Sequence, residues 1–410
     1  MFSWKLLPRG VKAVFFVQVV NRMGDFVFPF LTLLMTQVYG LGPAPAGLVV
    51  TAAMALESVG GLVAGRLSDR HGRRGVLVAF LSTSGALLAA AGFAPARLWA
   101  AVAIVASGFF VGAMRPVLAA LVADLSTPEL RRAAFSLSYL GINVGVSVGP
   151  LLAGWLFRHA LGWLFWIDAL STAAALVILV LNVPRRTHPS PAAASGSRAS
   201  LPGAAPPRAA ASEGSVADFL RNPVLFPFAL LGALYNVVYA QMIFTLGLQT
   251  VALFGPQGSL VYGAVWALNA LSVLGITPLA LQVTAGWSNL RSIAWGMGFF
   301  ALGTSVFLFH PGLPLVLAST ALWTAGEVMY SIHVGDLVSA YSPPSVRGRF
   351  QGYVQFLTTM GFVLSPVVGG LVAQGLGLAG VWWMATGLVA AAGAGFALVD
   401  RRARTVAPLA

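Results

Sequence analysis

The sequence has no cysteine among its 410 residues and few charged residues of either sign. Without cysteine the chain can form neither disulfide bonds nor thiolate metal sites, and the redox compartment stays undetermined. Asp, Glu, Lys and Arg make up 9% of the chain and apolar residues 58%. A soluble domain has about 25% charged residues. The mean hydropathy of +0.86 agrees with this composition. The sequence therefore indicates an integral membrane protein.

The sequence also lacks a phosphate-binding loop and a signal-peptide cleavage site. No phosphate-binding G-x-x-x-x-G-K-[S/T] loop occurs, so we expect no ATP-driven step within the chain. The basic start, MFSWKLLPRGVK, is not followed by an A-x-A-like cleavage site, and the apolar run after it is too long for a signal peptide. We therefore expect that run to be the first membrane span.

Apolar segments of about 20 residues recur along the chain, and each is long enough to cross a bilayer. Cutting the sequence at Gly, Pro and charge clusters predicts an all-α membrane protein with twelve transmembrane helices, at residues 12–36, 46–65, 76–95, 99–123, 133–157, 161–183, 224–252, 260–282, 292–310, 313–339, 350–373 and 379–399.

Lys and Arg are distributed unevenly over the predicted loops. Twenty of the 24 lie at the termini or in loops on the same side, and only Arg97 and Arg158 lie in loops on the other side. Cytoplasmic loops carry the excess of Lys and Arg, so we expect a multi-pass protein of the cell inner membrane with both termini in the cytoplasm. The net charge of +13 is dispersed over loops, which disfavours nucleic-acid binding and suits contact with membrane lipid.

The chain divides near its middle. Residues 187–217 are rich in Ala, Pro, Ser and Gly, which is typical of a linker. We expect an N-terminal six-helix bundle over residues 1–184, a cytoplasmic linker over 185–218 and a C-terminal six-helix bundle over 219–410. A shift of 216 residues aligns Gly145 with Gly361 and Trp166 with Trp382, so the halves resemble each other. Repeats of this kind are common in secondary transporters.

The loop after the second predicted span reads GRLSDRHGRRGVL, residues 65–77. It resembles the signature loop of the major facilitator superfamily at Gly65, Leu67, Asp69, Arg70, Gly72, Arg73 and Arg74. The resemblance implies the major facilitator fold, with a latch that closes the cytoplasmic side, made by Gly65, Asp69, Arg70, Gly72, Arg73 and Asp124. The alternative is that these basic residues only fix the topology. The corresponding loop of the second half, LQVTAGWSNLRSI, lacks the pattern, so we expect a weaker latch there.

The latch residues also have physical roles that do not depend on the resemblance. Gly65 allows a neighbouring helix to come close, and Gly72 permits a tight turn. Asp69 can accept hydrogen bonds from arginines or from the amides at a helix N-terminus.

The fifth predicted span contains GINVGVSVGPLLAG, residues 141–154. It resembles a motif of drug:proton antiporters of the same superfamily, with Ala153 in place of one glycine. Small residues at every fourth position let two helices pack backbone to backbone. We expect this packing at Gly141, Gly145, Gly149, Pro150 and Gly154. Ordinary tight packing without any link to antiport is the alternative.

The charged residues inside the predicted spans of the first half include Arg22, Asp25, Glu57 and Arg115. A charged side chain at the centre of a membrane helix costs about 2.5–3.5 kcal/mol on insertion scales. Two acids and two bases can neutralise one another, so we expect one charge cluster. Resemblance to drug exporters of this superfamily implies that the cluster couples transport to protons. A permanently paired cluster that only orients helices is the alternative.

In the second half, Glu327 falls near the middle of the tenth predicted span, without an obvious cationic partner in the sequence. We expect it either to be protonated or to meet a cationic ligand, and so to join the coupling residues. Aromatic residues suit flat or cationic molecules, although each could equally be packing. The expected substrate cavity comprises Gln18, Asn21, Tyr235, Tyr239, Trp266, Trp323 and Tyr330. Asp168, in the sixth predicted span, is expected to be structural.

Together these features predict a secondary transporter that exports amphipathic or cationic organic compounds in exchange for protons, by alternating access. The alternative is a proton-coupled symporter that takes up a small nutrient or a metal chelate. A channel or a receptor is disfavoured by the repeats and the latch loop. We expect no enzymatic activity, no cofactor and no metal site. The expected partners are a small-molecule substrate, protons and membrane lipid, and we expect a monomer.

Overall fold

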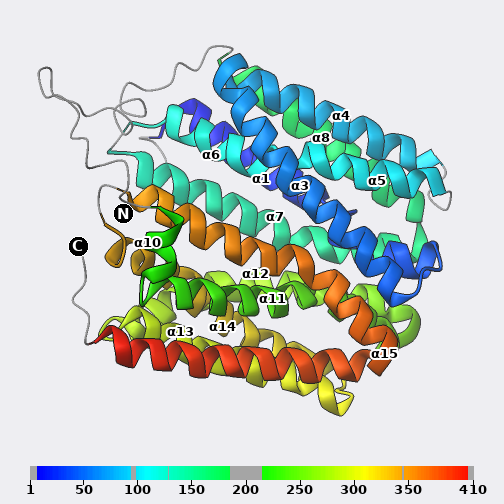
Figure 1. The fold of residues 1–410 in the computed structure, drawn as a ribbon. Coiled ribbons are helices and arrows are strands. Elements are labelled where there is room, and N and C mark those ends of the chain that lie inside the picture. Colours follow the sequence, from blue (N-terminus) through cyan, green and yellow to red (C-terminus); the bar gives the residue numbers. More distant parts are fainter. Residues whose placement is uncertain (1–6, 94–97, 128, 185–214, 344–345, 405–410) are drawn as a thin grey trace, which may run out of the picture. The chain divides into compact units, whose positions relative to one another are not determined.

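The protein is a set of helices joined by short turns, and no strand occurs in the residues described (Figure 1). We describe a computed structural model over residues 7–93, 98–127, 129–184, 215–343 and 346–404. A helix satisfies its own backbone hydrogen bonds, which is the requirement for a segment that lies in lipid.

The N-terminal part of the chain contains eight labelled helices and one π-helical turn. The turn, Leu34–Val38, follows α2 directly. The helices are α1 (Arg9–Gly24), α2 (Leu31–Leu33), α3 (Pro43–His71), α4 (Arg73–Phe93), α5 (Leu98–Val111), α6 (Met114–Asp124), α7 (Arg131–His159) and α8 (Leu161–Asn182).

The C-terminal part begins with α10, a short helix whose capping box is formed by Ser215 and Asp218. Two 3₁₀ turns, Gly255–Gln257 and Val306–Phe309, follow α11 and α13. The helices are α10 (Val216–Arg221), α11 (Leu225–Phe254), α12 (Gly258–Thr284), α13 (Asn289–Ser305), α14 (Leu313–Ala340) and α15 (Arg347–Ala403).

Nine helical stretches within the described residues are long and apolar enough to cross a membrane, so the chain is a multi-pass membrane protein. Two of them, Leu225–Thr284 and Arg347–Ala403, have 60 and 57 residues. One crossing needs about 20 residues. The second stretch turns at Gly377, whose φ of 71° is not helical. In contrast, α1 has 16 residues, which is fewer than one crossing needs. The count of twelve spans stays a prediction.

The chain forms two compact units. The first comprises residues 1–41, 49–204 and 259–270, and the second comprises residues 42–48, 205–258 and 271–410. Six-helix bundles at residues 1–184 and 219–410 stay a prediction, and most of the predicted linker lies outside the described residues.

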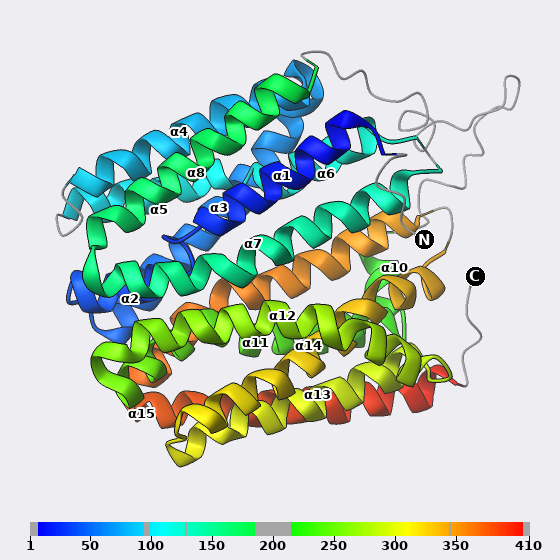
Figure 2. The same cartoon turned by 180° about the vertical axis from the view of Figure 1, so that it is seen from behind.

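In the first unit, α1 packs against α7 and α8, while α4 packs against α5 and α8. Its core includes Val14, Leu77, Leu118 and Leu179, which are nearly inaccessible to solvent. In the second unit, α11 packs along α15, and α13 packs against α14 and α15; Figure 2 shows α13, α14 and α15 side by side from behind. Trp382 stacks on Phe307 in this unit at 4.5 Å between ring centroids.

Candidate functional site

The first predicted span is not a continuous helix. Helix α1 ends at Gly24, and Asp25 leaves helical geometry with ψ of 82°. The backbone amides of Phe26 and Val27 both donate to Oδ2 of Asp168 in α8, at 3.1 Å each. Asp168 is 5% exposed, so a buried carboxylate replaces the helical acceptors of these amides. Non-helical backbone inside a membrane protein requires such a buried partner.

Other side chains hold the same region. Tyr262 lies in the part of α12 that belongs to the first unit. Its hydroxyl donates to the carbonyl of Pro29 at 3.0 Å. Gln18 donates to Ser138 Oγ at 3.2 Å, and Asn21 donates to Thr172 Oγ1 at 3.3 Å. Two of the residues expected in the substrate cavity, Gln18 and Asn21, therefore lie buried in contacts of α1 with α7 and α8.

Five charged residues of the first unit interact with one another near the break in α1. Arg22 Nη1 lies 2.5 Å from Asp25 Oδ2. Glu57 in α3 interacts electrostatically with Arg115, Asp25 and Arg22, and Arg115 is its strongest partner of opposite charge. Asp168 interacts electrostatically with Asp25 and Arg22. Five charged groups, three acids and two bases, thus share one neighbourhood.

Close backbone packing places Glu57 beside a second helix break. The helix of α5 ends at Val111, and α6 begins at Met114. A Cβ at Gly112, between them, would collide with the carbonyl oxygen of Glu57. Arg115 follows directly and its side chain is exposed in the structure. The exposed Arg115 therefore follows the helix break that packs against the backbone of Glu57, and it interacts electrostatically with Glu57.

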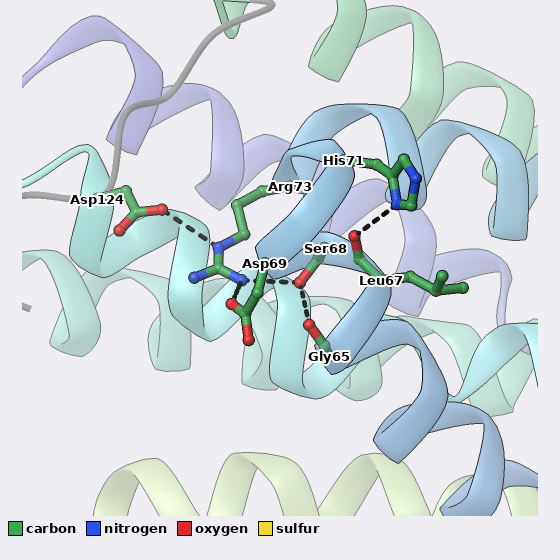
Figure 3. A network of polar contacts seen from close by, with 7 residues as sticks. All are labelled: Gly65, Leu67, Ser68, Asp69, His71, Arg73 and Asp124. Atoms are coloured by element: carbon green, nitrogen blue, oxygen red, sulfur yellow. Dashed lines mark hydrogen bonds and ion pairs between the residues drawn. The ribbon is translucent and has the colours of Figure 1, made fainter. Parts of the chain in front are cut away.

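The predicted cytoplasmic latch forms a polar network in the first unit (Figure 3). Arg73, at the start of α4, forms an ion pair with Asp69, lies 3.3 Å from Asp124 Oδ2 and donates to Ser68 Oγ at 2.8 Å. Asp124 is almost fully buried, with 5% of its side chain exposed, whereas 66% of the Asp69 side chain is exposed. One arginine thus joins the end of α3 to the end of α6.

The glycines of the loop have different surroundings. Gly72 is the single residue between α3 and α4, and its φ of 87° is one that side-chain-bearing residues rarely adopt. A Cβ at Gly65 would meet no atom within 4 Å, so the structure shows no close helix approach there. Arg70 is exposed, and Arg74 donates to the carbonyl of Val183 at 2.7 Å, which caps the end of α8.

The glycine motif of the fifth predicted span lies in α7. A Cβ at Gly141, Gly145 or Gly149 would collide with backbone or Cβ atoms of α1 between Phe15 and Met23. Pro150 lies within the helix, and Gly154 faces Ser259 of α12 in the same unit. Helices α1 and α7 are therefore in backbone contact beside the Arg22–Asp25 pair.

In the second unit, Tyr239 of α11 donates its hydroxyl to Oε1 of Glu327 in α14 at 3.1 Å. The ring of Tyr235 lies 4.3 Å from that of Tyr330 and 5.4 Å from that of Phe300. Gly232 leaves space for the Tyr330 hydroxyl, which a Cβ there would approach to 2.8 Å. Trp323 is fully buried beside Phe300, while Trp266 belongs to the first unit.

The loop that lacks the signature pattern has its own polar contacts. Ser288 donates to Asp400 Oδ1 at 2.5 Å, and Arg404 pairs with Asp400 at 2.8 Å. His333 hydrogen-bonds to Asn289 Oδ1 and to Thr284 Oγ1, each at 3.0 Å. The polar contacts of this loop are therefore made by Ser288 and His333, whereas Arg73 makes those of the signature loop in the first unit.

The sequence predicted a structural role for Asp168 but not its partners, and it gave no sign of the second anchor of the α1 break, Tyr262. Asp168 bonds to amides 141 and 142 residues away, and Tyr262 bonds to a carbonyl 233 residues away. The available signal was the charge of Asp168 within an apolar span, which marks a group that needs a buried partner.

The fold and the membrane spans define a helical membrane protein, and its family follows from a family model. The model of the Major Facilitator Superfamily matches residues 14–332, and the chain belongs to that family. Its family members and structural neighbours are transporters of small molecules and not enzymes.

Individual proteins are similar at low identity. The MFS-type transporter YqjV of Bacillus subtilis is 27% identical over 378 residues, covering 90% of this chain and 88% of YqjV. The 3-(3-hydroxy-phenyl)propionate transporter of Escherichia coli is 27% identical over 387 residues, covering 90% and 88%. The multidrug resistance protein MdtH of Aeromonas salmonicida is 22% identical over 365 residues, covering 88% and 87%.

The crystal structure of an auto-inhibited POT family peptide transporter has the same fold, with a TM-score of 0.78 at 19% identity. The match covers 98% of each chain. At this identity the likeness establishes the fold alone.

Proposed function

We propose that the protein exports amphipathic or cationic organic compounds across the cell inner membrane in exchange for protons. The observation that carries the proposal is the Tyr239–Glu327 hydrogen bond at 3.1 Å within a group of aromatic rings. An acidic group beside aromatic faces can bind an organic cation through charge and through cation–π contact. Both termini are proposed to lie in the cytoplasm, and the working unit is proposed to be a monomer.

The coupling group is proposed to be the charge cluster of the first unit. Arg22 and Asp25 form a close pair, and Glu57 lies in the field of Arg115. The proton affinity of a carboxylate depends on its distance from a neighbouring arginine, so it changes when a conformational change alters that distance. Proton binding can thus be linked to a conformational change without any cofactor.

The latch supports alternating access as the mechanism. Arg73 holds the ends of α3 and α6 together through Asp69 and Asp124. We propose that this network stabilises the state closed to the cytoplasm and that it opens once per cycle, as two six-helix bundles rock around a central site. The predicted boundaries at residues 184 and 219 are kept in this proposal.

Inverted membrane vesicles with an acidic lumen test the exchange. Ethidium, a flat aromatic cation, is added outside, and lumenal pH is followed with a pH-sensitive dye. We expect ethidium to enter while protons leave the lumen, and Asp25→Asn to abolish proton release while downhill ethidium flow persists. Vesicles made without the protein are the background control.

A second candidate is proton-coupled uptake of a small nutrient. It is favoured by the likeness to the 3-(3-hydroxy-phenyl)propionate transporter, whose name describes an aromatic acid as its cargo. The likeness to MdtH, a multidrug resistance protein, favours export. If substrate and protons move in the same direction in the vesicles, uptake replaces export as the function.

A further inference from the structure

A groove of about 260 Å³ lies in the second unit, between the start of α11 and the end of α15. Its apolar lining comes from one face of each helix: Pro227, Leu230 and Leu231 of α11, and Gly395, Leu398 and Val399 of α15. The two helices pack along each other, so the two faces form one continuous groove. It is smaller than the about 300–1,000 Å³ that a drug-sized ligand occupies.

One end of the groove is basic. The remaining lining residue is Arg402, in the last turn of α15, and Arg401 and Arg404 are its exposed neighbours. Asp400 is the only acid among residues 395–404, and it is buried and paired with Arg404. Helix α10, which packs against α11 and α15, adds one acidic and one basic residue. This end of the groove therefore has a net positive charge, which suits an anion and disfavours the organic cation proposed as substrate.

The apolar and basic parts of the groove suit different depths of a bilayer. Leu230 and Leu398 are 45% and 58% exposed on helices apolar enough to cross a membrane, so they face lipid. Arg402 lies seven residues after Gly395, which is about 10 Å along a helix, and beyond the predicted end of the last span at residue 399. An arginine at this position lays its stem on apolar surface and keeps its guanidinium at the membrane interface.

We propose that this groove binds one anionic phospholipid, with Arg402 on the phosphate and the upper part of an acyl chain between α11 and α15. A guanidinium can bind phosphate through two parallel hydrogen bonds, and basic pockets between membrane helices recognise anionic headgroups. The lipid contacts both helices and so stabilises their packing. The inference goes beyond transport, and only the choice of the cytoplasmic leaflet rests on the proposed topology.

Native mass spectrometry of the purified full-length protein in detergent measures lipid binding. The probe is palmitoyl-oleoyl phosphatidylglycerol, and phosphatidylcholine with the same chains is the zwitterionic comparison. We expect phosphatidylglycerol to bind more tightly, and Arg402→Gln to weaken its binding about tenfold through loss of a charge-assisted contact.

Arg401→Gln is the matched control, because Arg401 is the adjacent exposed arginine and does not line the groove. We expect it to bind phosphatidylglycerol nearly as the wild type does. Diffuse attraction to surface charge predicts instead an equal loss, about fivefold, for either arginine. Equal weakening in the two variants would overturn the proposed site.

The apolar part of the groove is tested by filling it. Leu398→Trp keeps every arginine, and we expect it to weaken phosphatidylglycerol binding as strongly as Arg402→Gln does. Leu371→Trp is its control, because Leu371 is 62% exposed on the same helix but does not line the groove. Inorganic phosphate at millimolar concentration should not displace the lipid. Displacement by phosphate, or wild-type binding by Leu398→Trp, would reduce the site to a simple anion contact and overturn the inference.

Thermal melting gives a second measurement. Phosphatidylglycerol should raise the melting temperature of the wild type and of Arg401→Gln more than that of Arg402→Gln, and an equal rise in all three would contradict the inference. Displacement of the lipid by ethidium would make the groove part of the substrate path, and a dimer lost in Leu398→Trp would make it a contact between two copies. Either result overturns the lipid site. Failure of proton exchange in the vesicles refutes the proposed export and leaves these binding results unchanged.

Discussion

The carboxylate of Glu327 carries the prediction at the residue scale. Its Oε1 accepts from the Tyr239 hydroxyl, and the Tyr235 ring lies within its electrostatic range. Glu327→Gln keeps the shape and a hydrogen-bond acceptor but removes the charge. We expect ethidium affinity to fall about tenfold, because a charge-assisted contact contributes roughly 1.5 kcal/mol more than a neutral one.

Tyr239→Phe is the matched control, since it keeps the carboxylate and loses only the hydroxyl donor. Binding is measured by quenching of intrinsic tryptophan fluorescence with ethidium and with a neutral aromatic compound of similar size. The neutral compound should bind equally to the wild type and to Glu327→Gln. An equal loss for both compounds would show that Glu327 shapes the site rather than binding charge.

Individual residues differed in how far sequence could place them. The Arg22–Asp25 pair was predictable, because residues three positions apart share a helix face. The contacts of Gln18 and Asn21 were not predictable, because each side chain hydrogen-bonds to a residue on another helix more than 100 positions away in the sequence. Sequence periodicity gives the face of a helix but not the helix that covers it.

At the scale of helices, the latch makes a prediction from the unequal burial of its two acids. Asp69 is largely exposed and Asp124 is buried. An exposed ion pair contributes about 0–1 kcal/mol to stability, whereas breaking a buried one is strongly destabilising. We expect Asp69→Asn to lose transport with little change in melting temperature, and Asp124→Asn to lose transport and to melt at a clearly lower temperature.

Transport is measured as ethidium exchange, and melting as loss of tryptophan fluorescence in detergent. Loosening of the cytoplasmic side is followed by labelling a cysteine introduced in place of exposed Arg70. Faster labelling is expected in Asp69→Asn. Normal exchange in Asp69→Asn would remove the latch from the mechanism.

Helix packing gives a second prediction at this scale. Gly145 of α7 faces the backbone of α1 at Val19 and the Cβ of Arg22. We expect Gly145→Leu to force the two helices apart, to lower the free energy of unfolding by about 1–3 kcal/mol and to reduce transport. Gly275→Ala in α12 is the control, because a Cβ there meets no atom within 4 Å. Thermal melting of both variants checks the result, and an equally stable Gly145→Leu would contradict it.

The helices themselves were largely predictable, and their interruptions were not. The turn at Gly72 followed from the motif, and its φ of 87° agrees with a required glycine. The break after Gly24 was missed, because Val27, Phe28 and Phe30 are as apolar as any helical segment. Apolar composition places a segment in the membrane but leaves its backbone geometry to long-range partners such as Asp168.

For the whole molecule, composition and the loop motif were enough to predict the class and the family, which the family model over residues 14–332 shows. The number of crossings was harder, because α11 continues into α12 through a 3₁₀ turn and α15 turns at Gly377 without a polar loop. Substrate and direction depend on a few side chains on a shared fold, so the fold cannot supply them.

The absence of cysteine makes the topology testable one position at a time, since each introduced cysteine is unique. His71 and Arg401 lie at helix ends that the charge distribution places in the cytoplasm, whereas His159 and Gln257 lie at predicted outer ends, and all four are exposed. In intact cells, a membrane-impermeant maleimide should label His159→Cys and Gln257→Cys but not His71→Cys or Arg401→Cys. Permeabilised cells, in which all four should react, are the control. Labelling of Arg401→Cys in intact cells would place the C-terminal end of α15 outside and refute the orientation inferred from the 20 Lys and Arg residues on one side.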